Sequence, residues 1–108
     1  MRANPSRGDV WLADLGLVAK TRPVLVLSVT PDDLTDRDLR TVIPHTTSTR
    51  GGRFEVVVPV PFLKSGAFDT QNVLTIPTPK LIRRLGVLRA DQLQEVEVRL
   101  RMWLGLVT

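Results

Sequence analysis

Residues 23–29 read Pro-Val-Leu-Val-Leu-Ser-Val, an almost unbroken run of aliphatic side chains that ends at Thr30 and Pro31. Such a run predicts a β-strand, and the near absence of polar alternation predicts that both faces of this strand are buried. Pro23 occupies the first position of the run, where a strand tolerates the missing N–H. We therefore expect this segment to form the central strand of the core.

Other segments with strand-like composition, separated by turn-forming residues, are residues 10–15, 40–44, 53–59 and 67–76. Residues 46–52 between them are polar, end in two glycines and predict a loop. Residues 77–84 are predicted to form a short helix, with Pro79 in its first turn and Gly86 as its stop. Strands followed by helices favour a small twisted antiparallel barrel or sheet over a doubly wound α/β fold.

The end of the chain, residues 90–104, has the spacing of an amphipathic helix. One face of this helix would carry Leu93, Val96, Leu100, Trp103 and Leu104. Asp91 near its start and Arg101 near its end suit the helix dipole. Val98 and Met102 lie off this stripe, which indicates a second packing surface on the helix.

Composition excludes several classes of protein and of functional site. The 108 residues are 43% hydrophobic, which is enough for one core, so we expect a single domain over residues 1–108. No cysteine is present, which excludes disulfides, thiolate zinc sites and thiol nucleophiles. The N-terminal residues lack the apolar stretch of a signal peptide, and no apolar run is long enough to cross a membrane, so we expect a cytoplasmic protein. Phosphate-binding glycine loops and metal-ligand spacings are absent, so no cofactor or metal is expected.

Three stretches carry a resemblance to a known family, in the same order along the chain. The first joins Arg-Gly-Asp-Val-Trp at residues 7–11 to Lys-Thr-Arg-Pro-Val-Leu-Val-Leu-Ser at residues 20–28. The second is Val-Ile-Pro-His-Thr-Thr at residues 42–47. The third consists of Ser65, Gln71, Thr75-Ile76, Leu-Gly-Val-Leu at residues 85–88 and Leu-Gly-Leu at residues 104–106. Together they make the chain similar to the MazF/PemK family of toxin endoribonucleases of bacterial toxin–antitoxin systems.

The resemblance implies a mainly β fold, an SH3-like barrel of the CcdB/PemK type with a terminal helix, and a homodimer. It also implies sequence-specific cleavage of single-stranded RNA, chiefly mRNA, without a metal, and inhibition by a cognate antitoxin with a flexible C-terminal tail. In this family a ribose 2′-hydroxyl attacks the adjacent phosphorus and leaves a 2′,3′-cyclic phosphate and a 5′-hydroxyl. Arg22 matches the catalytic arginine of the family and Thr46 its catalytic threonine.

The residue types fit these roles. A guanidinium is a planar fork of donors for phosphate oxygens, so Arg22 is expected to stabilise the transition state. The guanidinium stays protonated at neutral pH and so has no free lone pair to act as a base, which leaves Arg22 as a stabiliser and a possible acid. Thr46 would donate its hydroxyl to a non-bridging oxygen. His45 has the one side chain in this sequence suited to proton transfer near neutrality. An extended backbone would point it away from Thr46, so a packed or surface histidine is the ordinary alternative.

Basic and polar residues around these positions are candidates for RNA binding. Those expected to contact RNA are Lys20, Thr47, Arg50, Arg53, Lys64, Ser65 and Gln71. Each also has an ordinary structural explanation, as a solvated rim or as a hydrogen-bonding turn residue. Trp11 is expected in the core rather than as a platform for bases.

Two other functions agree with the same fold. One is a non-catalytic toxin that poisons a protein target such as DNA gyrase. The other is a nucleic-acid-binding module that has lost turnover. The presence of both Arg22 and Thr46 favours the endoribonuclease.

Overall fold

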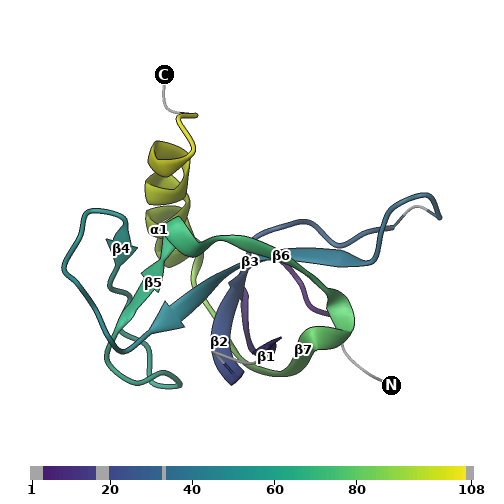
Figure 1. Cartoon of the computed structure of the whole chain (residues 1–108), viewed down its shortest axis with the longest axis horizontal. Coiled ribbons are helices and arrows are strands. Elements are labelled where there is room, and N and C mark those ends of the chain that lie inside the picture. Colours follow the sequence, from purple (N-terminus) through teal and green to yellow (C-terminus); the bar gives the residue numbers. More distant parts are fainter. Residues whose placement is uncertain (1–3, 17–19, 33, 107–108) are drawn as a thin grey trace.

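The computed structural model describes residues 4–16, 20–32 and 34–106. Strands and one α-helix make up this part of the chain, with short 3-10 turns at Thr70–Asn72 (η1) and Thr78–Lys80 (η2) (Figure 1). In chain order the elements are β1 (Asp9–Gly16), β2 (Lys20–Val26), β3 (Leu39–Thr46), β4 (Glu55–Val56), β5 (Ala67–Asp69), β6 (Leu74–Pro77), β7 (Leu81–Val87) and α1 (Ala90–Trp103).

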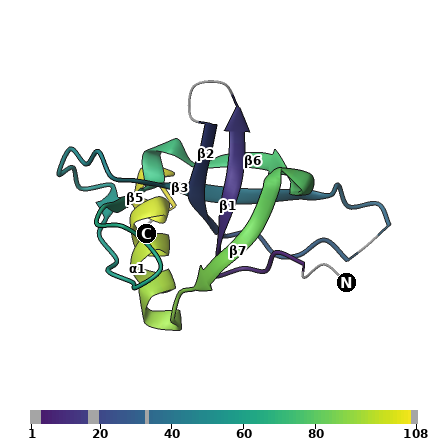
Figure 2. The same ribbon diagram turned by 90° about the horizontal axis from the view of Figure 1, so that it is seen from below.

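The strands form one antiparallel, seven-stranded sheet in the order β4-β5-β3-β2-β1-β7, with β6 also paired to β3. The mainly β class with a C-terminal helix is confirmed. The pairing path in the described residues runs from β4 to β7 and does not return to its start, so the sheet curves without closing into a complete barrel. β4 and β5 lie beside α1 at one end of the molecule (Figure 1), and β7 runs across β1 towards the start of α1 (Figure 2).

The predicted central strand is confirmed as β2, which lies between β1 and β3. Val24 and Val26 point into one apolar cluster, which includes Trp11 and Ile76. Leu25, between them, points into a second cluster on the other face of the sheet. Successive side chains of a strand alternate between faces, so burial on both faces requires the continuous apolar run seen in the sequence.

The terminal helix α1 packs on the second cluster through Val96, which is fully buried, and through Leu93 and Leu100. Trp103 and Leu104, the last members of the predicted stripe, are exposed by 43% and 49%. The stripe is therefore covered only over its first turns. No helix in the described residues is long and apolar enough to cross a membrane.

Arg7 links the loop before β1 to this helix. Its guanidinium lies 2.6 Å from a carboxylate oxygen of Glu97 and donates to the carbonyl oxygen of Leu27 at 2.6 Å. This pair of contacts links the loop before β1 both to the end of β2 and to α1.

The predicted helix at residues 77–84 is wrong. Only Thr78–Lys80 form a single 3-10 turn, and Leu81–Val87 continue as β7 and pair with β1. Pro79 does favour a turn, but the free edge of β1 offers backbone partners that a short isolated helix could not match. Strand pairing at long range therefore decides this segment.

The other predicted strands are confirmed in place but not in length. The segment 53–59 forms a strand only over Glu55–Val56. The segment 67–76 divides into β5 and β6 around η1, where the Thr70 hydroxyl donates to the carbonyl oxygen of Phe54 at 2.6 Å. This break lets the chain pair first with β4 and one end of β3, and then with the other end of β3.

Candidate active site

Arg22 and Thr46 come from neighbouring strands of the sheet. The β2–β3 pairing ends at Val24 opposite Pro44, and Arg22 and Thr46 lie two residues further along their strands. Residues two apart on a strand point to the same face, so Arg22 and Thr46 share the face of Val24 and Pro44. The sequence thus brings together two residues 24 positions apart, at the start of β2 and the end of β3.

The same face continues across β5 and β4. Thr46 is paired with Ala67, Asp69 lies two residues further along β5, and Asp69 is paired with Glu55. Thr46, Asp69 and Glu55 therefore share the face that carries Arg22. The opposite face carries His45, Phe68 and Val56, all of which are buried. Alternation along these strands separates a polar open face from the core.

Two cavities meet at Arg22, Thr46 and Ser48, which border both of them. We call these three residues the central ridge. The first cavity, of about 400 Å³, is lined by Thr21, Arg22, Pro23, His45, Thr46, Thr47, Ser48, Phe62, Leu63, Lys64 and Leu85. The second cavity, of about 360 Å³, is lined by Arg22, Thr46, Ser48, Arg50, Gly52, Phe54, Glu55, Asp69, Gln71 and Asn72.

Local contacts prepare both central side chains for an anion. The Thr46 hydroxyl oxygen accepts the backbone N–H of Ser48 at 3.0 Å, which leaves its own proton free to donate. The Arg22 side chain is half-buried and, within the described residues, has no hydrogen bond and no carboxylate within salt-bridge distance. A cation placed beside a free hydroxyl donor on an open ridge suits a phosphate group.

His45 belongs to the core, although its ring also borders the first cavity. Its side chain is 4% exposed and meets the Phe68 ring edge-on, with the ring centroids 5.1 Å apart. Burial lowers the pKa of His45 below its ordinary value of 6.5, so the ring is neutral at pH 7. The structure thus places His45 as the packed histidine that an extended backbone predicts.

The remaining predicted residues divide into two groups. Thr47 and Lys64 line the first cavity, and Arg50 and Gln71 line the second. Lys20, Arg53 and Ser65 line neither cavity.

The residues outside the cavities have other surroundings. Lys20 is exposed at the start of β2, with a left-handed φ of 53°. Arg53 lies over the Phe54 ring, 4.5 Å from its centroid. Ser65 is exposed just before β5. Trp11 is confirmed in the core, where its indole N–H donates to Asp9 at 3.2 Å.

Residues 6–104 match the family described as PemK-like, MazF-like toxin of type II toxin–antitoxin system. The chain belongs to the PemK/MazF-like toxin family. A curated relative, "Probable endoribonuclease MazF5" of Mycobacterium tuberculosis, is 35% identical over 92 residues, and the match covers 80% of this chain and 80% of the relative.

Solved structures agree with this membership of the PemK/MazF-like family. MazF of Deinococcus radiodurans is 28% identical, with a TM-score of 0.79 over 96% of this chain and 99% of that one. The toxin MazF-mt6 of Mycobacterium tuberculosis is 30% identical, with a TM-score of 0.75 over 93% of this chain and 99% of that one. A MazE–MazF structure from Deinococcus radiodurans is 26% identical, with a TM-score of 0.79 over 96% of this chain and 98% of that one.

Several residues that line the cavities of this PemK/MazF-like toxin were not predicted from the sequence. They are Ser48, Phe54, Glu55, Phe62, Leu63, Leu85, Asp69 and Asn72. Ser48 follows directly on the Thr46-Thr47 pair, which is a usable signal. The others lie far apart in the chain, and their residue types do not distinguish them from ordinary strand or turn residues.

One carboxylate of the second cavity is already engaged. Glu55 accepts the backbone N–H of Arg50 at 2.9 Å and that of Gly51 at 2.8 Å. These contacts anchor the polar loop after Thr46 in this PemK/MazF-like toxin, so Glu55 has a structural task. Within the described residues, no group of three His, Asp or Glu side chains has the arrangement needed to hold a metal ion.

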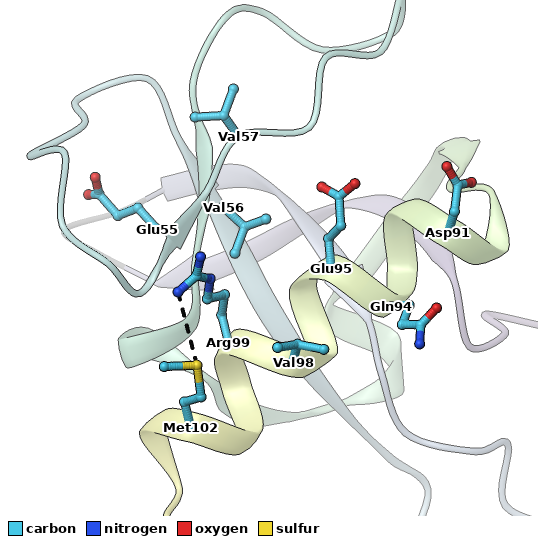
Figure 3. A pocket seen from close by; sticks show the side chains of 9 residues that line it. All are labelled: Glu55, Val56, Val57, Asp91, Gln94, Glu95, Val98, Arg99 and Met102. Atoms are coloured by element: carbon cyan, nitrogen blue, oxygen red, sulfur yellow. Dashed lines mark hydrogen bonds between the residues drawn. The ribbon is translucent and has the colours of Figure 1, made fainter. Parts of the chain in front are cut away.

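A third and larger groove of the PemK/MazF-like toxin, of about 660 Å³, lies between β4 and α1 (Figure 3). Its apolar residues are Val56, Val57, Val98 and Met102, and Asp91 and Glu95 project from the helix beside them. Val57 is 63% and Val98 is 48% exposed. The predicted second packing surface of the helix, Val98 and Met102, therefore lies in this groove.

Proposed function

We propose that this MazF-family toxin, an endoribonuclease, cleaves single-stranded RNA at the central ridge without a metal. The observation that carries the proposal is that Arg22 and Thr46, from neighbouring strands, both border the same two cavities. A strand of RNA laid over the ridge would place the phosphate at Arg22 and Thr46 and one flanking nucleotide in each cavity. The match over residues 6–104 supports treating the chain as one toxin domain.

The proposed reaction is an internal transesterification. The ribose 2′-hydroxyl releases its proton to solvent water as its oxygen attacks the adjacent phosphorus, and the bond from phosphorus to the 5′-oxygen breaks. The 5′-oxygen takes up a proton, so the products carry a 2′,3′-cyclic phosphate and a 5′-hydroxyl. Arg22 neutralises the charge that builds on the phosphorane and donates a proton towards the leaving 5′-oxygen. Thr46 donates to a non-bridging oxygen, and its bond from the Ser48 amide keeps its oxygen in place. His45, neutral and on the core face, supports the end of β3 by packing.

Basic residues around the ridge would hold the RNA backbone. Lys64 borders the first cavity and Arg50 the second, so the RNA path has a cation on each side of the cut. Lys20 and Arg53 are exposed beyond the cavities and would meet more distant phosphates. Such contacts make binding weaken as salt rises.

The proposed partner in the cell is a cognate antitoxin whose flexible, acidic tail covers the basic cleft. The solved MazE–MazF structure of a relative supports this assignment, because the two chains align over nearly their whole length. We place the toxin in the cytoplasm, where both mRNA and antitoxin are made.

We also propose that the toxin is a homodimer joined through the groove between β4 and α1. Val57 and Val98 leave apolar surface exposed in the groove, and Trp103, exposed at the end of α1, contacts Phe54 just before β4. Exposed apolar area that gathers on one face indicates an interface. The groove shares Glu55 with the second cavity but contains none of the three residues of the central ridge, so we expect a second copy to leave the ridge accessible.

The test uses purified toxin and a long single-stranded RNA in EDTA, with cut sites and end groups mapped. Wild-type protein is expected to cut at a recurring short sequence and to leave cyclic phosphate ends. Arg22→Ala and Thr46→Val should each lower the cleavage rate by about 100-fold or more while remaining folded. Thr46→Ser, which keeps the hydroxyl, is the matched control and should retain most activity. Absence of cutting by wild-type protein, or normal cutting by Arg22→Ala, would contradict the proposal.

A further inference from the structure

The second cavity contains a hydrogen-bond acceptor that the proposed reaction does not use. Asp69 lies at the end of β5, on the face that carries Thr46. The Asn72 side-chain amide donates to its Oδ2. Within the described residues, Oδ1 of Asp69 has no donor and no cation within salt-bridge distance. Asn72 thus holds the carboxylate in place and leaves one oxygen free towards the cavity.

A free carboxylate is out of place in a cleft built for phosphates. It repels the RNA backbone, and it lies in the same cavity as the central Arg22. The other carboxylate there, Glu55, already accepts the amides of Arg50 and Gly51. The free oxygen of Asp69 therefore suits a ligand group that donates a hydrogen bond. On RNA, the N–H groups of the bases are such donors.

The neighbours of Asp69 fit a nucleobase. Phe54 supplies an apolar wall, and the amide of Gln71 offers donor and acceptor groups in the same cavity. Arg50 adds a further donor for a ring nitrogen or carbonyl oxygen. A cavity of about 360 Å³ has ample room for one base. The first cavity has a different character, because Phe62, Leu63 and Leu85 make its wall apolar.

We propose that Asp69 determines sequence specificity by selecting, in the second cavity, a base that carries an exocyclic amino group and by disfavouring uracil. This inference rests on the proposed RNA cleavage. Adenine, cytosine and guanine each have an amino group that donates to the free carboxylate oxygen. Uracil has a carbonyl oxygen where cytosine carries its amino group, so the lone pairs of that oxygen face the carboxylate, and only the ring N3–H remains as a donor on that edge.

The experiment compares short RNA substrates that differ by one amino-to-carbonyl exchange at each of the two nucleotides flanking the mapped cut. Cytosine is exchanged for uracil, and adenine for hypoxanthine, since each pair has nearly the same shape. For wild-type toxin, kcat/KM at one flanking position is expected to fall by about 10- to 100-fold when the amino group is lost. Equal cleavage of both members of each pair, at both positions, would overturn the proposal.

Asp69→Asn identifies the residue responsible. Asparagine can still accept from Asn72, and it offers the cavity a donor as well as an acceptor, so the variant should cleave RNA with much of this discrimination lost. Asp32→Asn makes the same charge change in an exposed loop at the far end of β2 and should discriminate like wild type. Unchanged discrimination by folded Asp69→Asn would overturn the role of Asp69 while leaving RNA cleavage established. If Asp69→Asn does not fold, the wild-type comparison decides alone. A wild-type protein that cuts no RNA overturns both proposals.

Discussion

At the scale of single residues, His45 and Thr46 show how adjacent positions of one strand acquire opposite tasks. Thr46 lies on the open face and takes part in both cavities, whereas His45 packs on Phe68 in the core. Strand alternation alone produces this division. The histidine is therefore expected to matter for stability and its pH dependence rather than for proton transfer.

Replacing His45 by leucine tests this division. The pKa of folded His45 lies below the ordinary value of 6.5, so below pH 6.5 the unfolded chain binds the proton before the folded chain does. Wild-type protein should therefore lose unfolding free energy as the pH falls through and below 6.5, and His45→Leu should lose less over that window. Urea unfolding at a series of pH values measures the difference. Folded His45→Leu that no longer cuts RNA at neutral pH would instead indicate a chemical role for the ring.

At the scale of elements, the pairing of β5 with β3 depends on Gly66, the residue before β5. A Cβ atom at this position would lie 2.1 Å from the carbonyl oxygen of Thr46 and 2.8 Å from Cε1 of His45. No side chain fits at those distances. The glycine thus lets β5 approach the end of β3, and this approach brings Asp69 to the face that carries Thr46.

Gly66→Ala should therefore displace β5 from β3. We expect it to lower the unfolding free energy by about 1–3 kcal/mol, because backbone atoms must shift to accept the methyl group. RNA cleavage should fall as well, since the methyl group would press against the backbone of Thr46. Urea unfolding and the cleavage assay measure the two effects. Gly52→Ala is the matched control, because a Cβ atom at Gly52 would meet nothing within 4 Å and the stability should change little. Equal stability of the two variants would disprove this role for Gly66.

At the scale of the whole molecule, β4 separates two surfaces of different character. On one side lies the polar cleft with the central ridge, and on the other lies the groove against α1. Glu55 borders both, and its carboxylate anchors the loop that follows Thr46. Binding of a second copy in the groove would therefore act close to the loop that shapes the cleft.

A charge placed in the groove tests the proposed dimer. Wild-type toxin should sediment as a dimer, and Val98→Glu should weaken association by about 30-fold or more, because it puts an unpaired carboxylate into the apolar part of the interface. Val29→Glu is the matched control, since Val29 is exposed by 76% in the loop after β2. Analytical ultracentrifugation over a range of concentrations measures the dimer dissociation constant of both variants. A monomeric wild type, or a Val98→Glu protein as dimeric as Val29→Glu, would contradict this interface.

The residue patterns of the sequence sufficed to predict the features that depend on local burial. The apolar run at residues 23–29 predicts a strand buried on both faces, and the spacing at residues 90–104 predicts the terminal helix. The family resemblance selected Arg22 and Thr46 as candidates, and in the structure both residues border the same two cavities. The strand and the helix could be predicted because hydrophobic periodicity indicates which side of a segment packs against the core.

Features that depend on pairing with a strand far away in the sequence were determined only by the tertiary structure. Residues 81–87 became β7 because β1 offered a free edge. The segment 67–76 is interrupted at Thr70, and its two parts pair with opposite ends of β3. The second cavity likewise joins Asp69 to the ridge through strand register across β3, β5 and β4. A short segment does not encode which edge it will meet, because pairing energy comes from residues far away in the chain.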